Sequence, residues 1–189
     1  IELVTWRKFS EQSEYIVKKL GEVKEPFQLN TDYMILGFFL ELSPYGDLSQ
    51  FLKTHGETLD SKARRELLYD IARGVAAGHS EEVWHSDIKP QNALVFRREG
   101  RFIAKLMDFG SSFDPSSPNN RIGFTPRYVA PELLEPNAKP SAFSDIFSLG
   151  QLYYEFFSGD VVKDGFLDEV VTNETDDGMR KIENIAGRD

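Results

Sequence analysis

The sequence predicts an α+β chain, because apolar residues at helical spacing and short extended runs bounded by turn residues occur within the same 189 residues. The clearest helical pattern begins at residue 60, and a hairpin pattern covers residues 93–107. A second, strongly apolar helical pattern covers residues 145–157. Helices combined with short hairpin-connected strands are typical of this class.

The first third of the chain mixes short elements. Residues 9–20 carry apolar side chains at roughly helical spacing, which predicts a helix that stops at Gly21. Residues 33–42 are apolar and aromatic and follow a turn signal, so we expect one buried strand there. After a run of turn residues, Asp47 is expected to cap a short helix that reaches Leu52.

The middle of the chain carries the strongest local signals. Asp60 or Ser61 is suited to cap a helix that ends near Gly78, with apolar residues on one face. Residues 93–96 and 102–107 then predict two strands joined as a hairpin by a polar, glycine-containing link.

The last third begins with a predicted long loop over residues 111–127, and long loops in compact domains are usually functional or mobile. A short helical turn is expected at residues 132–134. The helix at residues 145–157 has few polar faces, which predicts that it is buried. The acidic tail after Gly159 is expected to be poorly packed.

Composition excludes several functional classes. With 22 Lys plus Arg against 31 Asp plus Glu, the net charge is −9, which argues against a general nucleic-acid binder but allows a local basic pocket. The absence of cysteine excludes disulfides, thiolate zinc sites and cysteine nucleophiles, and a reducing compartment is the default. The longest apolar stretch, residues 33–40, is too short to cross a bilayer. We therefore expect a cytoplasmic or nuclear protein with no membrane or nucleic-acid partner. Because Ile1 is not an initiator, we expect the native beginning to be missing.

The residues that carry chemistry lie in the run His-Ser-Asp-Ile-Lys-Pro-Gln-Asn at 85–92 and in Asp-Phe-Gly at 108–110. Asp87, Lys89 and Asn92 fall close together between a helix and a hairpin, and Asp108 follows that hairpin. Metal-assisted phosphoryl transfer needs such a set: one carboxylate orients the attacking hydroxyl, while a second carboxylate and a carboxamide hold magnesium. A lysine beside the base can neutralise the transferring group.

These motifs make the chain resemble the eukaryotic protein kinases. Residues 85–92 are similar to the catalytic loop of that family, and residues 108–110 are similar to its metal-binding motif. The substrate-docking segment of the family resembles residues 123–132, which end in Ala-Pro-Glu. The start of its buried central helix resembles residues 145–150, and the hinge that holds adenine resembles residues 40–48. The resemblance implies a kinase-like fold with an incomplete β-rich N-lobe and a mostly helical C-lobe.

The resemblance also implies roles for single residues. Asp87 would be the catalytic base, Lys89 would contact the transferring phosphate, and Thr125 would brace both. Asn92 and Asp108 would bind Mg²⁺. The Lys-Pro pair after the base is typical of serine/threonine kinases, which implies ATP and a protein substrate as the partners.

The nucleotide side of the site follows from the same resemblance. Leu40 would be the gatekeeper, and the backbone of Glu41 and of Ser43 would meet adenine. Asp47 would reach the ribose, and Leu94 would form the floor of the adenine pocket.

The resemblance further implies structural roles beside the catalytic ones. His85 and Phe109 would stack in the regulatory column of apolar side chains, and Asp145 would hold the backbone of the catalytic loop. His55 and His79 have no carboxylate or histidine at ligand spacing, which favours surface or helix-end positions.

Simpler interpretations of the catalytic set remain. Asp87 and Asp108 are also suited to cap turns, Asn92 to be a loop carboxamide and Lys89 to be a solvated charge. The joint spacing, however, favours the catalytic interpretation.

The chain departs from the family pattern before the hinge. Gly21 and Gly37 are the only glycines before Gly46, so residues 1–45 hold no glycine-rich phosphate loop. Arg7 and Lys8 are weak candidates for the phosphate-pairing residue, with Glu11 or Glu14 as the helix partner; ordinary solvated charges explain them equally well.

A further departure is Ser86, which stands where the family usually has an arginine that receives a phosphorylated activation loop. We therefore expect phosphorylation of the serines at 111, 112, 116 and 117 not to switch activity. Phosphomimetic substitutions at these positions, assayed for phosphoryl transfer, should leave the rate unchanged, and a many-fold rise would refute the prediction.

The sequence predicts three parts and leaves three functional hypotheses. The parts are an N-lobe remnant (residues 1–42), a C-lobe core (43–160) and an acidic, weakly structured tail (161–189), so the domain is truncated or degenerate at both ends. The chain is a serine/threonine kinase using ATP and Mg²⁺, or a pseudokinase that acts as a binding module. A small-molecule phosphotransferase is the third hypothesis, and the docking segment at 123–132 argues against it.

Overall fold

The computed structural model describes residues 11, 13–22, 27–30, 33–35, 37–117 and 123–158, and the predicted α+β class is confirmed. The strands and α-helices in these ranges are β1 (Lys19–Glu22), β2 (Phe27–Asn30), β3 (Tyr33–Ile35), β4 (Phe38–Leu40), α2 (Leu48–His55), α3 (Ser61–His79), β5 (Ala93–Arg98), β6 (Arg101–Leu106) and α4 (Ala142–Ser158). The predicted acidic tail after Gly159 lies outside the described residues.

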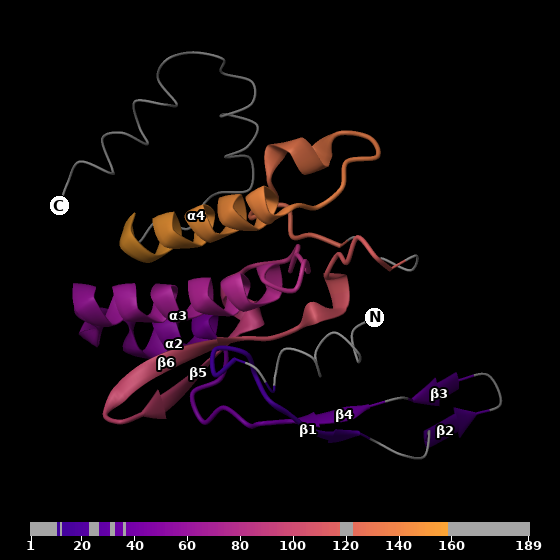
Figure 1. Cartoon of the computed structure of the whole chain (residues 1–189). Coiled ribbons are helices and arrows are strands. Elements are labelled where there is room, and N and C mark those ends of the chain that lie inside the picture. The colour runs from indigo at the N-terminus through magenta and orange to yellow at the C-terminus, as the bar shows by residue number, and fades with distance from the viewer. Residues whose placement is uncertain are drawn as a thin grey trace, which may run out of the picture.

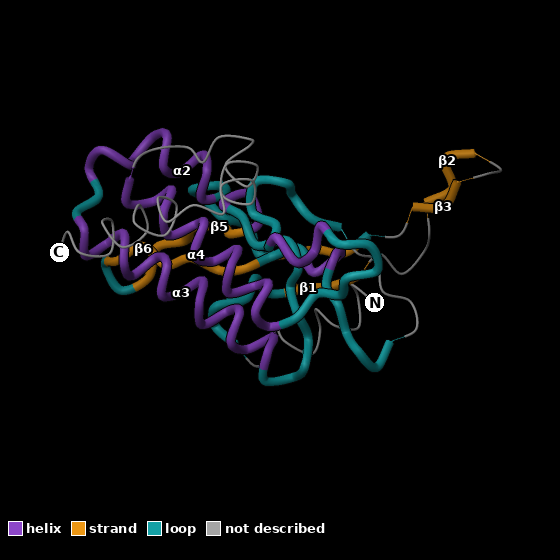
Figure 2. The backbone as a smooth tube through the Cα atoms, turned by 90° about the horizontal axis from the view of Figure 1, so that it is seen from above, coloured by secondary structure: helices purple, strands orange, loops and turns teal. Residues whose placement is uncertain are grey.

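The elements are arranged as layers with one projecting arm. Helix α4 lies on α3, and α3 lies on the β5–β6 hairpin, with α2 beside them (Figure 1). Strand β1 pairs antiparallel with β4, and β2 pairs antiparallel with β3. Seen from above, the β2–β3 pair lies at the far end of the arm, away from the helices (Figure 2). The main core is therefore formed by the helices and the β5–β6 hairpin.

Helices α2 and α3 form where the sequence predicts them, because each has an aspartate cap. Asp47 Oδ1 accepts from Gln50 N at 2.9 Å, and Asp60 Oδ1 accepts from Ala63 N at 2.7 Å. Helix α3 packs on β6 and on α4, and its buried residues recur at helical spacing: Leu67, Leu68, Asp70, Ile71, Gly74, Val75 and Gly78. Helix α2 extends beyond the predicted Leu52 to His55.

The predicted hairpin is confirmed, with a tighter turn than expected. β5 and β6 pair in register from Ala93 opposite Leu106 to Arg98 opposite Arg101. The two turn residues, Glu99 and Gly100, both have positive φ, as the favoured two-residue hairpin turn requires. The hairpin is therefore a regular ladder that sets the positions of the residues just before β5 and just after β6.

A buried ion pair joins the hairpin to α3. The Asp70 side chain is almost fully buried and accepts from Arg101 Nη1 at 2.8 Å and from Ala104 N at 3.2 Å. These hydrogen bonds from the guanidinium to Asp70 raise the pKa of Arg101. The ion pair and the hydrogen bond from Ala104 N attach the hairpin to the helix.

Gly74 in α3 lies where no side chain fits. A Cβ there would lie 2.8 Å from the backbone oxygen of Tyr15 and 3.1 Å from Leu106 Cβ. Gly74→Ala should therefore lower the free energy of unfolding by about 1–3 kcal/mol, as overpacking does. Gly150→Ala in α4 is the matched control, because nothing lies within 4 Å of its added Cβ; helix propensity should raise its stability by about 1 kcal/mol. Urea unfolding measures both, and equal effects would contradict the close packing.

The helix predicted over residues 9–20 is wrong for the part described. Ile16 forms a bridge to Leu106, Val17 N donates to Leu106 O at 2.9 Å, and Lys19 begins a strand. Ile16 and Val17 are fully buried. The spacing of so few apolar residues is compatible with either a helix or a strand. Pairing with a strand about ninety residues later in the chain decides in favour of extended structure.

The single buried strand predicted over residues 33–42 is also corrected. The run forms β3 and β4, with Gly37 between them, and each strand pairs with a different partner. Phe39 is 61% exposed and Leu42 89% exposed, so this arm is not buried as expected. Each strand pair of the arm is a sheet of only two strands, and within the described residues no second layer covers it. The side chains of Phe39 and Leu42 therefore remain in contact with solvent.

Helix α4 begins three residues earlier than predicted and is only partly buried. The described residues leave Phe143 82% exposed and Ile146 55% exposed. The buried stripe is instead partly polar, with Asp145 and Ser148 hydrogen-bonded to other segments. The prediction of a wholly buried helix was wrong, because hydrogen bonding rather than hydrophobicity determines which face of this half of α4 points inward.

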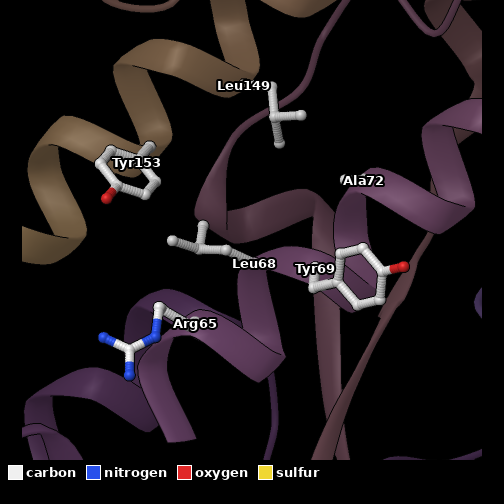
Figure 3. Close-up of a pocket in the computed structure, with 6 residues that line it drawn as sticks. All are labelled: Arg65, Leu68, Tyr69, Ala72, Leu149 and Tyr153. Carbon is white, nitrogen blue, oxygen red and sulfur yellow. The ribbon is translucent and has the colours of Figure 1, made fainter. Parts of the chain in front are cut away.

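A shallow hollow of about 390 Å³ lies between α3 and α4 (Figure 3). Its lining comes from both helices and is almost entirely apolar: Arg65, Leu68, Tyr69, Ala72, Leu149 and Tyr153. These residues lie between positions 65 and 72 of α3 and between 149 and 153 of α4. The motifs described next instead meet α3 at His79, its last residue, and α4 at Asp145, in its first turn. None of the helices in the described part of the chain is long and apolar enough to cross a membrane.

Candidate active site

The β5–β6 hairpin brings the two predicted metal ligands to one end of the molecule. Asn92 directly precedes β5, and Asp108 follows β6 by two residues. Met107 N donates to Asn92 O at 2.9 Å, which continues the ladder beyond the paired Ala93 and Leu106. Residues separated by sixteen positions are thus neighbours because of strand register.

Asp87 is the centre of a network of hydrogen bonds. Its Oδ1 accepts from Thr125 Oγ1 at 2.7 Å, and its Oδ2 accepts from Asn92 Nδ2 at 3.0 Å. Lys89 Nζ lies 2.7 Å from Asp87 Oδ2 and donates to Thr125 Oγ1 at 2.8 Å. The side chain of Asp87 is 12% exposed and that of Lys89 is 22% exposed. Thr125 therefore contacts both predicted catalytic residues from a segment 38 positions away.

Asp145 of α4 binds the backbone of the residues that precede Asp87. Its fully buried carboxylate accepts from the backbone N–H of His85 and of Ser86, both at 2.8 Å. Ser86 has φ of 67°, in the left-handed region that non-glycine residues seldom adopt. The two hydrogen bonds hold this turn in place, and the turn directs Asp87 toward Thr125.

His85 is packed as a structural histidine, as predicted. It is 2% exposed, its Nε2 lies 2.9 Å from Met107 O, and its Nδ1 accepts from Asp87 N at 3.3 Å. Its ring lies against that of Phe109, with the centroids 4.9 Å apart. Both ring nitrogens are engaged with backbone groups, so His85 links the catalytic loop to the segment that carries Asp108.

The donor set of Asn92 and Asp108 fits Mg²⁺. Asn92 Nδ2 donates to the backbone oxygen of Asp87 at 2.8 Å and to its Oδ2 at 3.0 Å. The carbonyl Oδ1 of Asn92 is thereby left for another ligand. Asp108 Oδ1 accepts from Gly110 N at 3.2 Å. Every buried side-chain oxygen of the described residues has a hydrogen-bond partner. The side-chain oxygens of Asn92 and Asp108 that have no such partner are therefore accessible. One carboxylate and one carboxamide oxygen are hard ligands suited to magnesium that also binds phosphate and water.

The residues predicted to bind the nucleoside lie along one side of the hairpin. Leu40 and Leu94 are both partly buried and pack against the main core. Glu41 N donates to Lys18 O at 3.0 Å, and Ser43 Oγ donates to Val95 O. Residues 41–46, the part of the hinge that lies between β4 and Asp47, are thereby attached both to the segment before β1 and to β5.

Asp47 also lies beside the hairpin, where it forms a bridge with Leu94. Its Oδ1 caps α2. A ribose contact by Asp47 would therefore use the other carboxylate oxygen.

The expectation for His79 was incomplete. His79 ends α3 as predicted, but its Nε2 lies 2.8 Å from Asp145 Oδ2, so it has the carboxylate partner that the sequence did not reveal. The two residues are 66 positions apart, and no local spacing could indicate the contact. His55 ends α2 and stacks on Phe51 with ring centroids 4.6 Å apart, consistent with a helix-end position.

Only the glutamate candidates for the phosphate-pairing ion pair lie within the described residues. Arg7 and Lys8 lie outside the described residues. Glu11 is exposed, and Glu14 forms an ion pair with Arg98 of β5. Glu14 is thus already paired with a cation of the hairpin.

The docking segment is anchored to α4. Ser148 Oγ donates to Tyr128 O at 2.7 Å, and the Tyr128 hydroxyl donates to Glu155. Burial and this hydrogen bond raise the pKa of Tyr128 well above its usual range. Tyr128 therefore stays a neutral donor. Glu132, the glutamate of Ala-Pro-Glu, is exposed and so avoids the cost of a buried, unpaired carboxylate.

Comparison with known proteins gives one consistent result. The family described as "Protein kinase domain" matches residues 2–187. The chain is 37% identical over 122 residues to a calcium and calcium/calmodulin-dependent serine/threonine-protein kinase of Lilium longiflorum, covering 64% of this chain and 23% of that protein. It is 32% identical over 144 residues to calcium-dependent protein kinase 7 of Oryza sativa subsp. japonica, covering 75% and 26%.

A third relative is the dual specificity protein kinase zakA of Dictyostelium discoideum, 36% identical over 126 residues, covering 60% of this chain and 16% of that protein. The chain thus spans about a quarter or less of the length of these three relatives. Because the family match covers nearly all of the chain and the catalytic motifs meet in one site, this protein belongs to the protein kinase family.

Proposed function

We propose that this chain carries the catalytic centre of a serine/threonine protein kinase, which transfers the γ-phosphoryl group of ATP to a protein hydroxyl with Mg²⁺. The single observation that carries the proposal is the Asp87 carboxylate, held by Thr125 and Asn92 and paired with Lys89. Such positioning is the main contribution a protein makes to phosphoryl transfer. ATP and magnesium imply action inside the cell, in the cytoplasm or nucleus.

In this proposal Asp87 orients the substrate hydroxyl and accepts its proton. The hydroxyl oxygen forms a bond to the γ-phosphorus as the bond from that phosphorus to the bridging oxygen breaks, and ADP leaves. The hydrogen bonds from Thr125 and Asn92 restrict the rotation of the carboxylate, so little reorganisation is needed at the moment of transfer.

Lys89 would stabilise charge on the transferring group, because its ammonium lies beside the base and is partly exposed. Asn92 and Asp108 would hold Mg²⁺, which when bound neutralises charge on the phosphates. Leu40, Leu94 and the hinge backbone of Glu41 and Ser43 would hold the adenine, with Asp47 near the ribose.

The direct test is phosphoryl transfer from ATP to peptides that carry serine, threonine or tyrosine as the only acceptor. We expect Mg²⁺-dependent phosphorylation of the serine and threonine peptides, because Lys-Pro follows the base. The relative from Lilium longiflorum is also named a serine/threonine-protein kinase. Exclusive phosphorylation of the tyrosine peptide would contradict the specificity proposed.

A second candidate is a kinase-like binding module that binds nucleotide or protein without transfer. The observation that favours it is Ser86, which stands where the family usually has an arginine. Nucleotide binding without any peptide phosphorylation, unaffected by Asp87→Ala, would support the module instead of the enzyme.

A further inference from the structure

A largely buried ion pair, with the Lys105 side chain 10% and the Glu41 side chain 20% exposed, joins the hinge to the hairpin that precedes Asp108. Lys105 Nζ donates to both carboxylate oxygens of Glu41, at 2.7 and 2.8 Å. Lys105 lies in β6, three residues before Asp108, and is 8% exposed. Glu41 directly follows β4 and begins the hinge. The two residues are 64 positions apart, and neither was singled out for this contact by the sequence.

Glu41 also connects the hinge to the strand arm. Its Oε1 accepts from Lys18 N at 2.7 Å, while its own N–H donates to Lys18 O at 3.0 Å. The carboxylate therefore receives donors from two different segments, the residue before β1 and the ammonium of β6. Its position is fixed from both sides.

Lys105 lies on the face of the hairpin that the proposed adenine site uses. It is directly opposite Leu94 in the β5–β6 ladder, and directly opposed residues project from the same face. Its Nζ also lies 4.6 Å from the centroid of the Phe96 ring, which provides a cation–π contact. The ammonium is thus held by Glu41 and an aromatic face beside Leu94.

We propose that Lys105 and Glu41 form a positioning pair that sets the distance between the hinge and the β5–β6 hairpin. The hinge would hold the adenine and the end of the hairpin would hold Mg²⁺, so this distance determines whether one nucleotide reaches both. The inference rests on the proposed function. Removing one partner of an ion pair that is largely buried is destabilising, because the charge of the other partner is left without compensation.

The test measures the Kd of Mg–ADP and the KM and kcat of peptide phosphorylation for the 189-residue chain and its variants. Lys105→Met should raise the Kd of ADP and the KM for ATP by about tenfold, the range expected for a lost charge-assisted hydrogen bond. The kcat at saturating ATP should change by less than about twofold, because Asp87 and its partners are untouched.

Two further variants separate positioning from a general loss of structure. Lys105→Arg keeps the charge that pairs with Glu41 and should keep most of the affinity. Lys62→Met is the matched control, since within the described ranges Lys62 forms an exposed ion pair with Glu66 at 3.8 Å, far from the hinge in sequence, and its loss should change no parameter.

The outcomes distinguish this inference from the function on which it rests. If the wild-type chain binds ADP and Lys105→Met binds it equally well, the positioning role is wrong while the proposed function stands. If the wild-type chain binds no nucleotide, both are wrong. If Lys105→Met does not fold, Glu41→Gln keeps the side-chain size and should show the same rise in Kd; unchanged affinity in that variant would overturn the inference.

Discussion

Asp87→Asn should lower the turnover of peptide phosphorylation by about 10³-fold and leave the Kd of Mg–ADP within about threefold. The substitution keeps the size of the side chain but removes the charge that accepts a proton, and general-base catalysis is worth about 10²–10⁴-fold. Nucleotide contacts assigned to the hinge and to Asp108 are not altered. Steady-state transfer assays and calorimetric titration of ADP measure the two quantities.

The matched control for this prediction is Asp60→Asn. Asp60 lies directly before α3, where its Oδ1 accepts from Ala63 N at 2.7 Å, and asparagine caps helices as well as aspartate does. Its variant should keep the wild-type turnover. An Asp87→Asn variant with more than about a tenth of the wild-type turnover would show that Asp87 is not the base.

Asp145→Ala should lower the free energy of unfolding by about 3–5 kcal/mol. The substitution leaves the buried N–H groups of His85 and Ser86 without acceptors and removes the partner of His79. Each buried unsatisfied group costs about 1–3 kcal/mol. Because these N–H groups belong to the turn that directs Asp87, turnover should fall as well.

Urea unfolding compares this variant with Asp60→Ala, which removes only the N-cap of α3 and should cost about 1 kcal/mol. Asp145→Asn offers one acceptor instead of two and should lie between the wild type and Asp145→Ala. Equal stability losses for the Asp145→Ala and Asp60→Ala variants would contradict the role given to Asp145.

The sequence predicts those parts of the fold that local interactions determine. Asp60 caps α3 within three residues of its own position, and the hairpin turn at Gly100 closes strands that are adjacent in sequence. The catalytic motifs are also local, since Asp87, Lys89 and Asn92 share one short loop. Family resemblance extended this to Thr125, whose contact with Asp87 the structure contains.

The errors arise where distant segments meet. Ile16 adopts extended structure because Leu106 offers it backbone partners, and nothing near Ile16 in sequence indicates this. The same reason explains the missed contact between His79 and Asp145 and the missed ion pair between Lys105 and Glu41. Such pairs depend on how the layers pack, and composition or spacing does not report that packing.

The central claim is that Asn92 and Asp108 form, with the hinge, one site for magnesium and ATP. Calorimetric titration of ATP into the 189-residue chain, with and without Mg²⁺, tests it most directly. We predict saturable one-to-one binding that requires Mg²⁺ and is weakened about tenfold or more by Asp108→Asn, which removes the charge of the carboxylate that would hold the metal. Binding that is absent with Mg²⁺, or equally strong without it and in the Asp108→Asn variant, would contradict the account.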